Sequence, residues 1–211
     1  MDFRKAIQNI KEELRKPLPG KEHQNLMAPD IRRFPKNEVA ERKAAVMICL
    51  FEGKNDLQIA FIKRTEYEGP HSGQISFPGG IYKQDDSSLL GTAIRETEEE
   101  IGITGDHARI LGVLSPLHIP VSNIIVHPFV AYYEYEPCFQ IDEKEVSYMI
   151  IANLKSFFDP GNRKKEKWIL SGQEIEVPFF QLDGNKIWGA TAMILCEFIS
   201  VAIQAKIYPD L

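Results

Sequence analysis

Residues 88–103 read SLLGTAIRETEEEIGI, and this stretch decides the fold because it predicts a helix with an acidic cluster beside an apolar stripe. At about 100° per residue, a helix places Glu96, Glu99 and Glu100 on one face and turns Glu98 away from them. The stripe that we expect to pack on the core consists of Leu90, Ala93, Ile94, Thr97 and Ile101. The stretch therefore predicts a helix that carries three carboxylates next to the core.

The ends of this helix carry recognisable signals. Ser87 or Ser88 suits the N-cap position, and Gly102 suits the left-handed residue that ends a helix. Arg95 lies four residues before Glu99, a spacing at which the two side chains can pair. These signals predict a helix over residues 88–101.

Like charges at this spacing destabilise a helix, and near its C-terminal end the helix dipole disfavours anions as well. A cation would offset both effects, and carboxylate oxygens are hard ligands that suit Mg²⁺ or Mn²⁺. A run of glutamates on its own is more typical of a solvated acidic face. The preceding FPGG, residues 77–80, favours a site instead, because Gly79 and Gly80 let the backbone approach a ligand or the helix closely.

Outward from this helix, apolar runs predict strands that cluster into hairpins rather than alternating regularly with helices. We expect strands over 44–51, 57–63, 108–115, 124–135, 145–151, 174–180 and 186–188, a charged turn over 162–167, and helices over 2–16, 153–158 and 190–205. This order predicts an α/β sandwich with a mixed sheet and helices on its faces.

The composition excludes several classes of protein. The chain has 211 residues, of which 44% are hydrophobic and 26% charged, as is usual for a soluble globular protein. A net charge of −5 argues against a protein that coats nucleic acid, although it allows a small anionic substrate. Three cysteines without a CxxC spacing predict no zinc ribbon and a reduced, cytoplasmic setting. We expect neither a secretory signal nor a membrane span.

The N-terminal part differs in character from the remainder. Residues 1–42 are expected to form a helix followed by a polar arm, and residues 43–211 to form a single domain. The arm could cover the same subunit or a second copy, so the sequence is compatible with a homodimer.

The glutamate helix and the glycine before it resemble a known motif. Gly80, followed by Arg95-Glu96-Thr97-x-Glu99-Glu100-x-Gly102-Ile103, resembles the Nudix box, G-x5-E-x7-R-E-U-x-E-E-x-G-U with U aliphatic. The resemblance implies an α/β/α sandwich with a mixed sheet, a divalent metal, and hydrolysis of a nucleoside diphosphate linked to another moiety. It implies that Glu96, Glu99 and Glu100 bind the metal and that Arg95 orients them.

The match departs from the pattern in its spacing and at two positions. The gap between the glycine and the arginine is one residue longer, Asp86 stands where the pattern has its first glutamate, and Thr97 replaces an aliphatic residue. We expect Asp86 to assist in metal binding, although it could instead cap the helix.

Three segments resemble the coenzyme A pyrophosphatase branch of the Nudix family. They are HSGQISFPGG at 71–80, FIKRT at 61–65 and IWGATA at 187–192. Gly69 and Lys83 depart from that branch, where arginine and aspartate are common. The resemblance implies hydrolysis of coenzyme A or acyl-coenzyme A to 3′,5′-ADP and 4′-phosphopantetheine.

The residues expected to contact the substrate surround the predicted metal site. They are Lys63, Arg64, His71, Gly79 and Gly80, with Lys83 as a further candidate for a phosphate contact. His118 and His127 flank strand ends and could line the pocket or be structural. Two alternatives stay open: a Nudix pyrophosphatase for ADP-ribose or another nucleotide, and a catalytically silent Nudix module that senses a nucleotide or binds protein.

Overall fold

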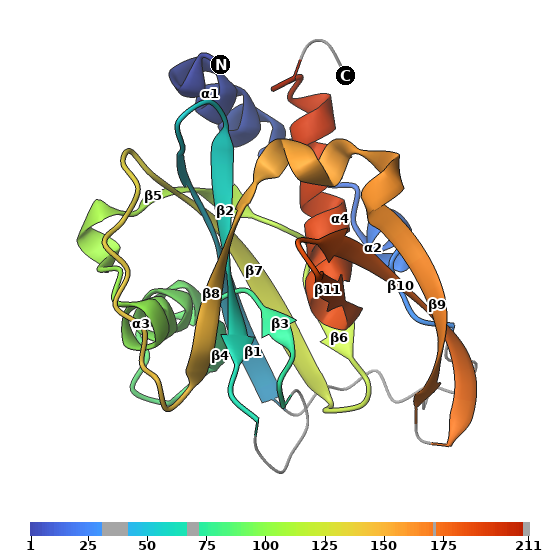
Figure 1. Ribbon diagram of the computed structural model, residues 1–211. Helices are drawn as coiled ribbons and strands as arrows, with labels where there is room; N and C mark the ends of the chain where they lie inside the picture. Colours follow the sequence, from blue (N-terminus) through green and yellow to red (C-terminus); the bar gives the residue numbers. More distant parts are fainter. Residues whose placement is uncertain (31–41, 67–71, 171, 209–211) are drawn as a thin grey trace.

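The computed structural model describes residues 1–30, 42–66, 72–170 and 172–208, and Figure 1 shows the arrangement of its elements. The strands of the main sheet are β1 Arg42–Glu52, β2 Leu57–Arg64, β3 Ile75–Ser76, β4 Gly79–Ile81, β5 Arg109–Val113, β6 Leu117–Ile119, β7 Ile124–Tyr133 and β8 Val146–Asn153. A second sheet contains β9 Arg163–Leu170, β10 Gln173–Leu182 and β11 Asn185–Trp188. The α-helices are α1 Phe3–Glu13, α2 Lys21–Asn25, α3 Leu89–Ile101 and α4 Gly189–Gln204.

The main sheet is mixed, as expected from the sequence. β1 pairs in parallel with β7, and the other pairings of the sheet are antiparallel. Its central path runs β3-β2-β1-β7-β5, with β4 against β1, β6 against β7 and β8 against β2. The end of β1 pairs with β2, and the beginning of β1 pairs with β4. The glycines of β4 therefore lie in the middle of the sheet.

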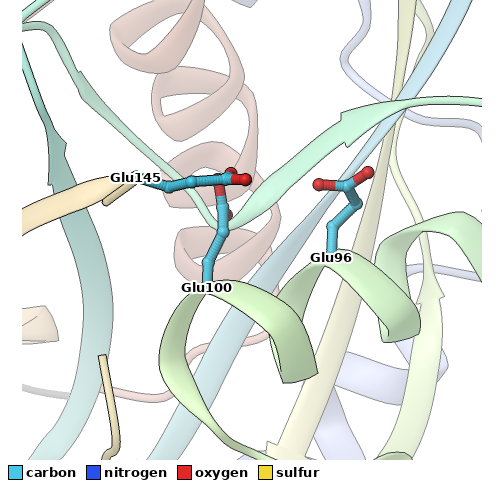
Figure 2. A group of neighbouring side chains, drawn as sticks. All are labelled: Glu96, Glu100 and Glu145. Carbon is cyan, nitrogen blue, oxygen red and sulfur yellow. The ribbon is translucent and has the colours of Figure 1, made fainter. Parts of the chain in front are cut away.

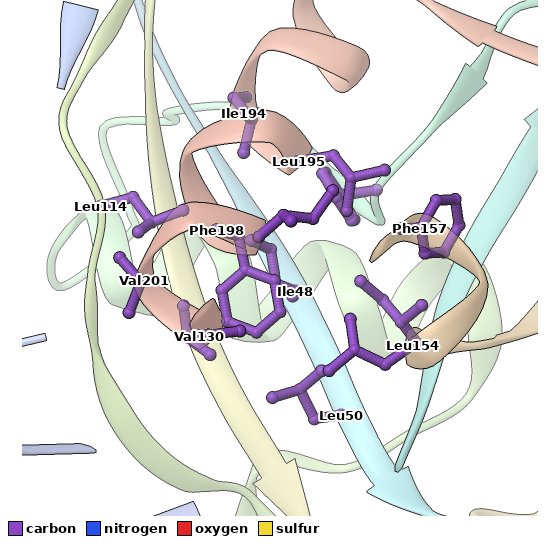
Figure 3. Packing of buried hydrophobic residues seen from close by; sticks show 14 of the residues in the cluster. Ile48, Leu50, Leu114, Val130, Leu154, Phe157, Ile194, Leu195, Phe198 and Val201 are labelled. Atoms are coloured by element: carbon purple, nitrogen blue, oxygen red, sulfur yellow. The ribbon is translucent and has the colours of Figure 1, made fainter. Parts of the chain in front are cut away.

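Helices cover both faces of this sheet, which confirms the predicted α/β/α sandwich. In Figure 1, α3 lies on one face and α4 on the other. The residues of β1 alternate between the two cores, because successive side chains of a strand point to opposite faces. Met47 and Cys49 pack in the cluster under α3, whereas Ile48 and Leu50 pack in the cluster around α4. Figure 3 shows the second cluster, in which Phe198 of α4 lies against Ile48 of β1.

The N-terminal helix is part of the core around α4. Ile7 and Ile10 of α1 are fully buried and belong to the same cluster as Phe198. The amide Nδ2 of Asn9 donates to the carbonyl of Ala205 at 3.0 Å. Where we expected only a polar arm, the structure contains α2, and Gln24 within it is buried. The expected arm residues 31–41 lie outside the described residues.

The second sheet corrects one expectation. Residues 162–167 were expected to form a charged turn, but the structure places most of them in β9, antiparallel to β10. Lys165 pairs with Glu176 at 2.9 Å and Lys167 with Glu174 at 2.8 Å across the two strands. Alternating charged residues can therefore be read as the outer face of a hairpin as well as a turn.

The remaining boundaries lie close to those expected. The strand expected at 145–151 is β8, and a 3-10 helix, Leu154–Phe158, follows it. β10 and β11 form the predicted hairpin, with Asp183 and Gly184 at the left-handed turn positions. In the part of the chain that the structure describes, no helix is both long enough and apolar enough to cross a membrane.

Candidate active site

Helix α3 has the predicted ends and presents two of its glutamates to the interior. The hydroxyl of Ser88 accepts a hydrogen bond from the backbone N–H of Gly91 at 3.0 Å, and Gly102 ends the helix with φ +73°. Glu100 is fully buried and Glu96 is 7% exposed. Glu99 points outward, with half of its side chain exposed. The three carboxylates therefore share a side of the helix, but only two of them reach the sheet.

Two glycines of β4 allow this close approach. Gly79 has φ +151°, and a Cβ at that position would overlap the carbonyl oxygen of Ala45. A Cβ on Gly80 would lie 2.5 Å from the carboxylate carbon of Glu96. Side chains at either position would displace the strand or the carboxylate, so both glycines are required where the sequence predicted a close contact.

Glu100 is held by one backbone donor and one cation. The N–H of Gly79 donates to its Oε2 at 2.8 Å, and the guanidinium of Arg64 donates to its Oε1 at 2.9 Å. Burial is the largest cause that raises the pKa of Glu100, and the nearby carboxylates of Glu96 and Glu145 act in the same direction. Against the opposing effects of Arg64 and Gly79, the pKa is raised to about 7. Two partners therefore only partly offset the cost of burying this charge.

The third carboxylate of the site is Glu145, which the sequence reading missed. One carboxylate oxygen each from Glu96, Glu100 and Glu145 lie within 4.8 Å of one another, as Figure 2 shows. The backbone carbonyl of Glu145 accepts from the N–H of Thr65 at 3.0 Å, beside the register pair of Arg64 and Val146. The pairing of β8 with β2, and the hydrogen bonds from the N–H groups of Gln140 and Asp142 to the last carbonyls of α3, bring Glu145 to the helix, so no local pattern could have revealed it.

Arg95 organises the outer side of the site. Its guanidinium donates to both oxygens of Asp86, at 2.6 and 3.0 Å, and also to Glu96 at 2.6 Å and Glu99 at 2.8 Å. The arginine holds the pKa of Asp86 well below its usual range, and Asp86 in turn raises the pKa of Arg95. Arg95 thus orients Glu96, as the resemblance implied, and fixes Glu99 at the rim.

Asp86 differs from the role expected for it. Besides Arg95, its Oδ2 accepts from the N–H of Lys83 at 2.9 Å and from the hydroxyl of Thr92 at 2.8 Å. Because both oxygens are engaged in this way, Asp86 supports Arg95 and the start of the helix, and it is not one of the three clustered carboxylates. These contacts favour the structural alternative at the start of the helix, and Asp86 stays outside the group of Glu96, Glu100 and Glu145.

The predicted cations are distributed unevenly around the cluster. Arg64 contacts it directly, and the Nζ of Lys83 lies 3.9 Å from Glu96 and 3.8 Å from Glu99. Lys63 is half-buried on β2, opposite Tyr148 of β8. His71 lies outside the described residues. Of these groups, Arg64 is the one that the structure ties most firmly to the site.

The two histidines considered as pocket residues lie apart from the cluster. His118 contacts the side chain of Asn123 at 3.3 Å within the β6–β7 turn. His127 of β7 pairs with Ala45 of β1. Burial and the nearby Lys43 lower the pKa of His127. Neither lines the cavity described next.

A cavity of about 360 Å³ opens beside the carboxylates on the α4 side of the sheet. Gly79, Gly80 and Arg64 line it and also contact Glu96 or Glu100, so a single layer of backbone separates the cavity from the cluster. Its other lining residues are Arg42, Ala44, Val46, Gln74, Ser76, Phe77, Ile81, Ile119, Ser122, Ile124, Val126, Ala190, Thr191 and Ile194. A substrate could thus place one part at the carboxylates and another in the cavity.

The donor set of the cluster fits a divalent cation. Its three clustered ligand atoms are all carboxylate oxygens, the type that Mg²⁺ and Mn²⁺ prefer. Three carboxylates lie together here, Arg64 is the cation that contacts Glu100, and burial raises the pKa of that glutamate. A divalent cation bound by these oxygens would offset their mutual repulsion.

Comparisons with known proteins agree with this geometry. A model of the NUDIX domain matches residues 41–171. The chain is 33% identical over 210 residues to Nudix hydrolase 22, chloroplastic, of Arabidopsis thaliana, a match that covers 96% of this chain and 67% of that protein. It is 34% identical over 170 residues to Nudix hydrolase 15, mitochondrial, of the same plant, and this match covers 77% of this chain and 59% of that protein. The chain thus spans roughly three fifths to two thirds of these plant relatives.

The fold is similar to that of solved structures as well. The MutT protein from Methanosarcina mazei Go1 superposes with a TM-score of 0.51 at 17% identity, over 78% of this chain and 95% of that one. This likeness supports the fold alone, whereas the domain model matches more than half of the chain and contains the glycine and glutamate motif. The chain belongs to the Nudix hydrolase family.

Proposed function

We propose that this chain is a divalent-metal-dependent pyrophosphohydrolase that cleaves coenzyme A or acyl-coenzyme A into 3′,5′-ADP and 4′-phosphopantetheine. The observation that carries the proposal is the group formed by Glu96, Glu100 and Glu145, whose oxygens lie within 4.8 Å of one another beside a cavity. Family membership supports hydrolysis of a nucleoside-diphosphate-linked substrate.

The phosphoanhydride bond resists attack because both phosphorus centres carry negative charge. A bound Mg²⁺ or Mn²⁺ would neutralise that charge and lower the pKa of a water molecule. Glu96, Glu100 and Glu145 would hold the ion, and a carboxylate of this group would accept the proton of the attacking water. Glu99 lies at the rim beside this group, where it accepts a hydrogen bond from Arg95, and it would serve as a further ligand or base.

The neighbouring basic residues have separate tasks. Arg95 keeps the carboxylate of Glu96 in place through the 2.6 Å contact. Arg64 lines the cavity and contacts Glu100, so it lies where a phosphate of the substrate would enter. Lys83 and Lys63 are candidates for additional phosphate contacts at the exposed side.

The choice of coenzyme A is supported by where three segments of the chain lie. The segments 61–65, 71–80 and 187–192 resemble the coenzyme A pyrophosphatase branch, and they are far apart in the sequence. Residues of all three segments line the same cavity: Arg64 from the first, Gln74, Ser76, Phe77, Gly79 and Gly80 from the second, and Ala190 and Thr191 from the third. The hydroxyl of Thr191 also donates to the carbonyl of Ile75 at 2.9 Å, which joins two of the segments. Their convergence on one cavity beside the carboxylates is expected if they recognise one substrate.

A substrate panel tests this proposal. Purified protein with Mg²⁺ or Mn²⁺ is incubated with coenzyme A, an acyl-coenzyme A, ADP-ribose and a dinucleoside polyphosphate, and the products are separated by chromatography. We expect release of 3′,5′-ADP from the coenzyme A compounds at a higher kcat/KM than for the other substrates. Turnover of ADP-ribose without release of 3′,5′-ADP would transfer the assignment to another nucleotide substrate. A protein that binds nucleotides but hydrolyses none of the panel would be a silent sensing module.

A further inference from the structure

The cavity beside the carboxylates is long and follows β1. Arg42, Ala44 and Val46 alternate along one face of this strand and all line it, and Val46 pairs with Gly79. Arg42 and Val46 are about 13 Å apart at roughly 3.3 Å per residue. The cavity therefore leads away from the carboxylates towards the start of β1, where Arg42 contacts the carbonyl of Ser122 at 3.4 Å.

The walls of the cavity are aliphatic. The side chains that form them are Ala44, Val46, Ile81, Ile119, Ile124, Val126, Ala190 and Ile194. Phe77 is the single aromatic residue among the described lining residues; it is 1% exposed and its ring stacks on Phe61 at 4.9 Å between centroids. Since purines are commonly bound by exposed aromatic faces, these walls suit a branched aliphatic chain better than a base.

The charges and hydroxyl groups of the cavity add to this selectivity. Among the described residues that line it, only Arg42 and Arg64 carry charge, and they stand at its two ends. Ser76 and Ser122 also line it, and their buried hydroxyl oxygens have no hydrogen-bond partner in the described part of the chain. Buried polar atoms are rarely left without a partner, so a ligand with amide groups could complete these bonds.

We propose that this cavity binds the pantetheine arm of the substrate, with the nucleoside half lying on the other side of the carboxylates. Within the proposed function, this specifies which half of the molecule the cavity recognises. The arm has a dimethyl-branched carbon and two amide groups, which match the aliphatic walls and the two serine hydroxyls. Its phosphate end would lie at Arg64 and Gly79, next to the cluster of glutamates.

The test uses the two product halves as separate probes. Binding of 4′-phosphopantetheine and of 3′,5′-ADP is measured by titration calorimetry, and each is also tested as an inhibitor of hydrolysis. Ala190→Leu places a larger side chain in the cavity from the first turn of α4, and Ala108→Leu is the control at a half-buried alanine beside the opposite face of the sheet. We expect Ala190→Leu to weaken 4′-phosphopantetheine binding about tenfold or more and to leave 3′,5′-ADP binding within about twofold of the wild type.

A second variant removes a hydrogen bond without filling space. Ser76→Ala should weaken 4′-phosphopantetheine binding about fivefold, again with little effect on 3′,5′-ADP, and it serves if Ala190→Leu lowers the melting temperature. Loss of 3′,5′-ADP binding in either variant, with 4′-phosphopantetheine unaffected, would assign the cavity to the nucleoside half. If the folded variants bind each fragment as tightly as the wild type does, the cavity takes no part in substrate recognition.

Fragment binding separates this inference from the proposed hydrolysis. Neither fragment has to be cleaved, so the two titrations report on the cavity even if the substrate panel shows no release of 3′,5′-ADP. Conversely, hydrolysis of coenzyme A that Ala190→Leu leaves unchanged in KM would keep the proposed function and contradict the role of the cavity.

Discussion

Glu100 and Glu197 are both fully buried carboxylates, on helices that cover opposite faces of one sheet, yet their surroundings differ. Glu197 of α4 accepts hydrogen bonds from Gln24 Nε2 at 2.8 Å, from the N–H of Ser115 at 3.1 Å and from the N–H of Gly20 at 3.2 Å. Glu100 has one N–H donor and one arginine, and it faces two further carboxylates.

The difference shows what distinguishes a structural carboxylate from one in a reactive site. Three donors from two segments surround Glu197, so it joins α4 to the β5–β6 connection and to the N-terminal segment. Around Glu100 the carboxylates outnumber the cations, and its pKa is raised to about 7 mainly by burial. Burial alone therefore does not indicate function, whereas burial next to other carboxylates leaves a charge that a metal ion can neutralise.

The largest expected effect is a loss of activity when a carboxylate beside the cavity is replaced, as distinct from the structural Glu197. Glu96→Gln and Glu100→Gln should each reduce kcat/KM at least about a hundredfold, because the amide cannot bind the ion as a carboxylate does. The fold should persist, since glutamine keeps the size of the side chain and removes the repulsion between neighbouring carboxylates, which offsets the acceptor that Glu100→Gln loses opposite Gly79 or Arg64. Glu98→Gln, at an exposed position of the same helix, is the matched control for steady-state kinetics. Wild-type rates in both site variants would remove the metal site from the mechanism.

The complementary change should affect stability rather than chemistry. Glu197→Gln leaves an NH₂ group facing a donor, either the two backbone N–H groups at Oε1 or the Gln24 amide at Oε2, and should lower the free energy of unfolding by about 2 kcal/mol. Urea unfolding monitored by circular dichroism measures this loss, and the folded variant should retain wild-type kcat. A loss of activity without a loss of stability would show that Glu197 is not the structural counterpart of Glu100.

Arg95 offers a smaller test of how the site is ordered. Lysine cannot contact Asp86, Glu96 and Glu99 at once as the guanidinium does, so Arg95→Lys should lower kcat/KM about tenfold. As a positioning residue, it should also weaken Mn²⁺ binding in the absence of substrate. If metal binding stays at the wild-type level while activity falls, Arg95 acts on the substrate instead of on the glutamates.

The smallest expected effect concerns His127, which is not among the residues described around Glu100 or Glu197. Its folded-state pKa is lowered below 6.5 by burial and by Lys43, so the unfolded chain binds the proton more strongly. The stability that this histidine contributes is complete above pH 6.5 and decreases as the pH falls towards the folded-state pKa. Thermal unfolding between pH 7.5 and about 5.5 should show a shallower decrease for His127→Gln than for wild type. Parallel pH profiles would contradict this assignment.

Sequence reasoning was most accurate where local chemistry decides structure. The glutamate helix, a serine cap at position 87 or 88 and the Gly102 end could be read directly, because periodicity and capping are local properties. The need for Gly80 could also be read, although only the structure identifies Glu96 as the residue that it contacts. The two faces of β1 were not separable from its sequence, since a strand buried on both sides lacks alternation.

The missed features all depend on contacts between distant segments. Glu145 reaches the site through the register of β8 on β2 and the hydrogen bonds of residues 140–142 to the end of α3. Two of the three donors to Glu197 come from a segment more than 170 residues earlier. β9 was misread because cross-strand ion pairs with β10 give a charged strand the composition of a turn. Such pairings depend on tertiary packing, which no local pattern encodes.

The most direct test of the metal site is Mn²⁺ titration by calorimetry in the absence of substrate. Wild type and Glu197→Gln should bind Mn²⁺ with the same affinity, whereas Glu100→Gln and Glu145→Gln should each weaken binding about tenfold or more. The Glu145 variant is decisive, because the structure alone brings this residue to the other two. Wild-type affinity in Glu145→Gln and Glu100→Gln, or a loss confined to Glu197→Gln, would contradict the proposed site.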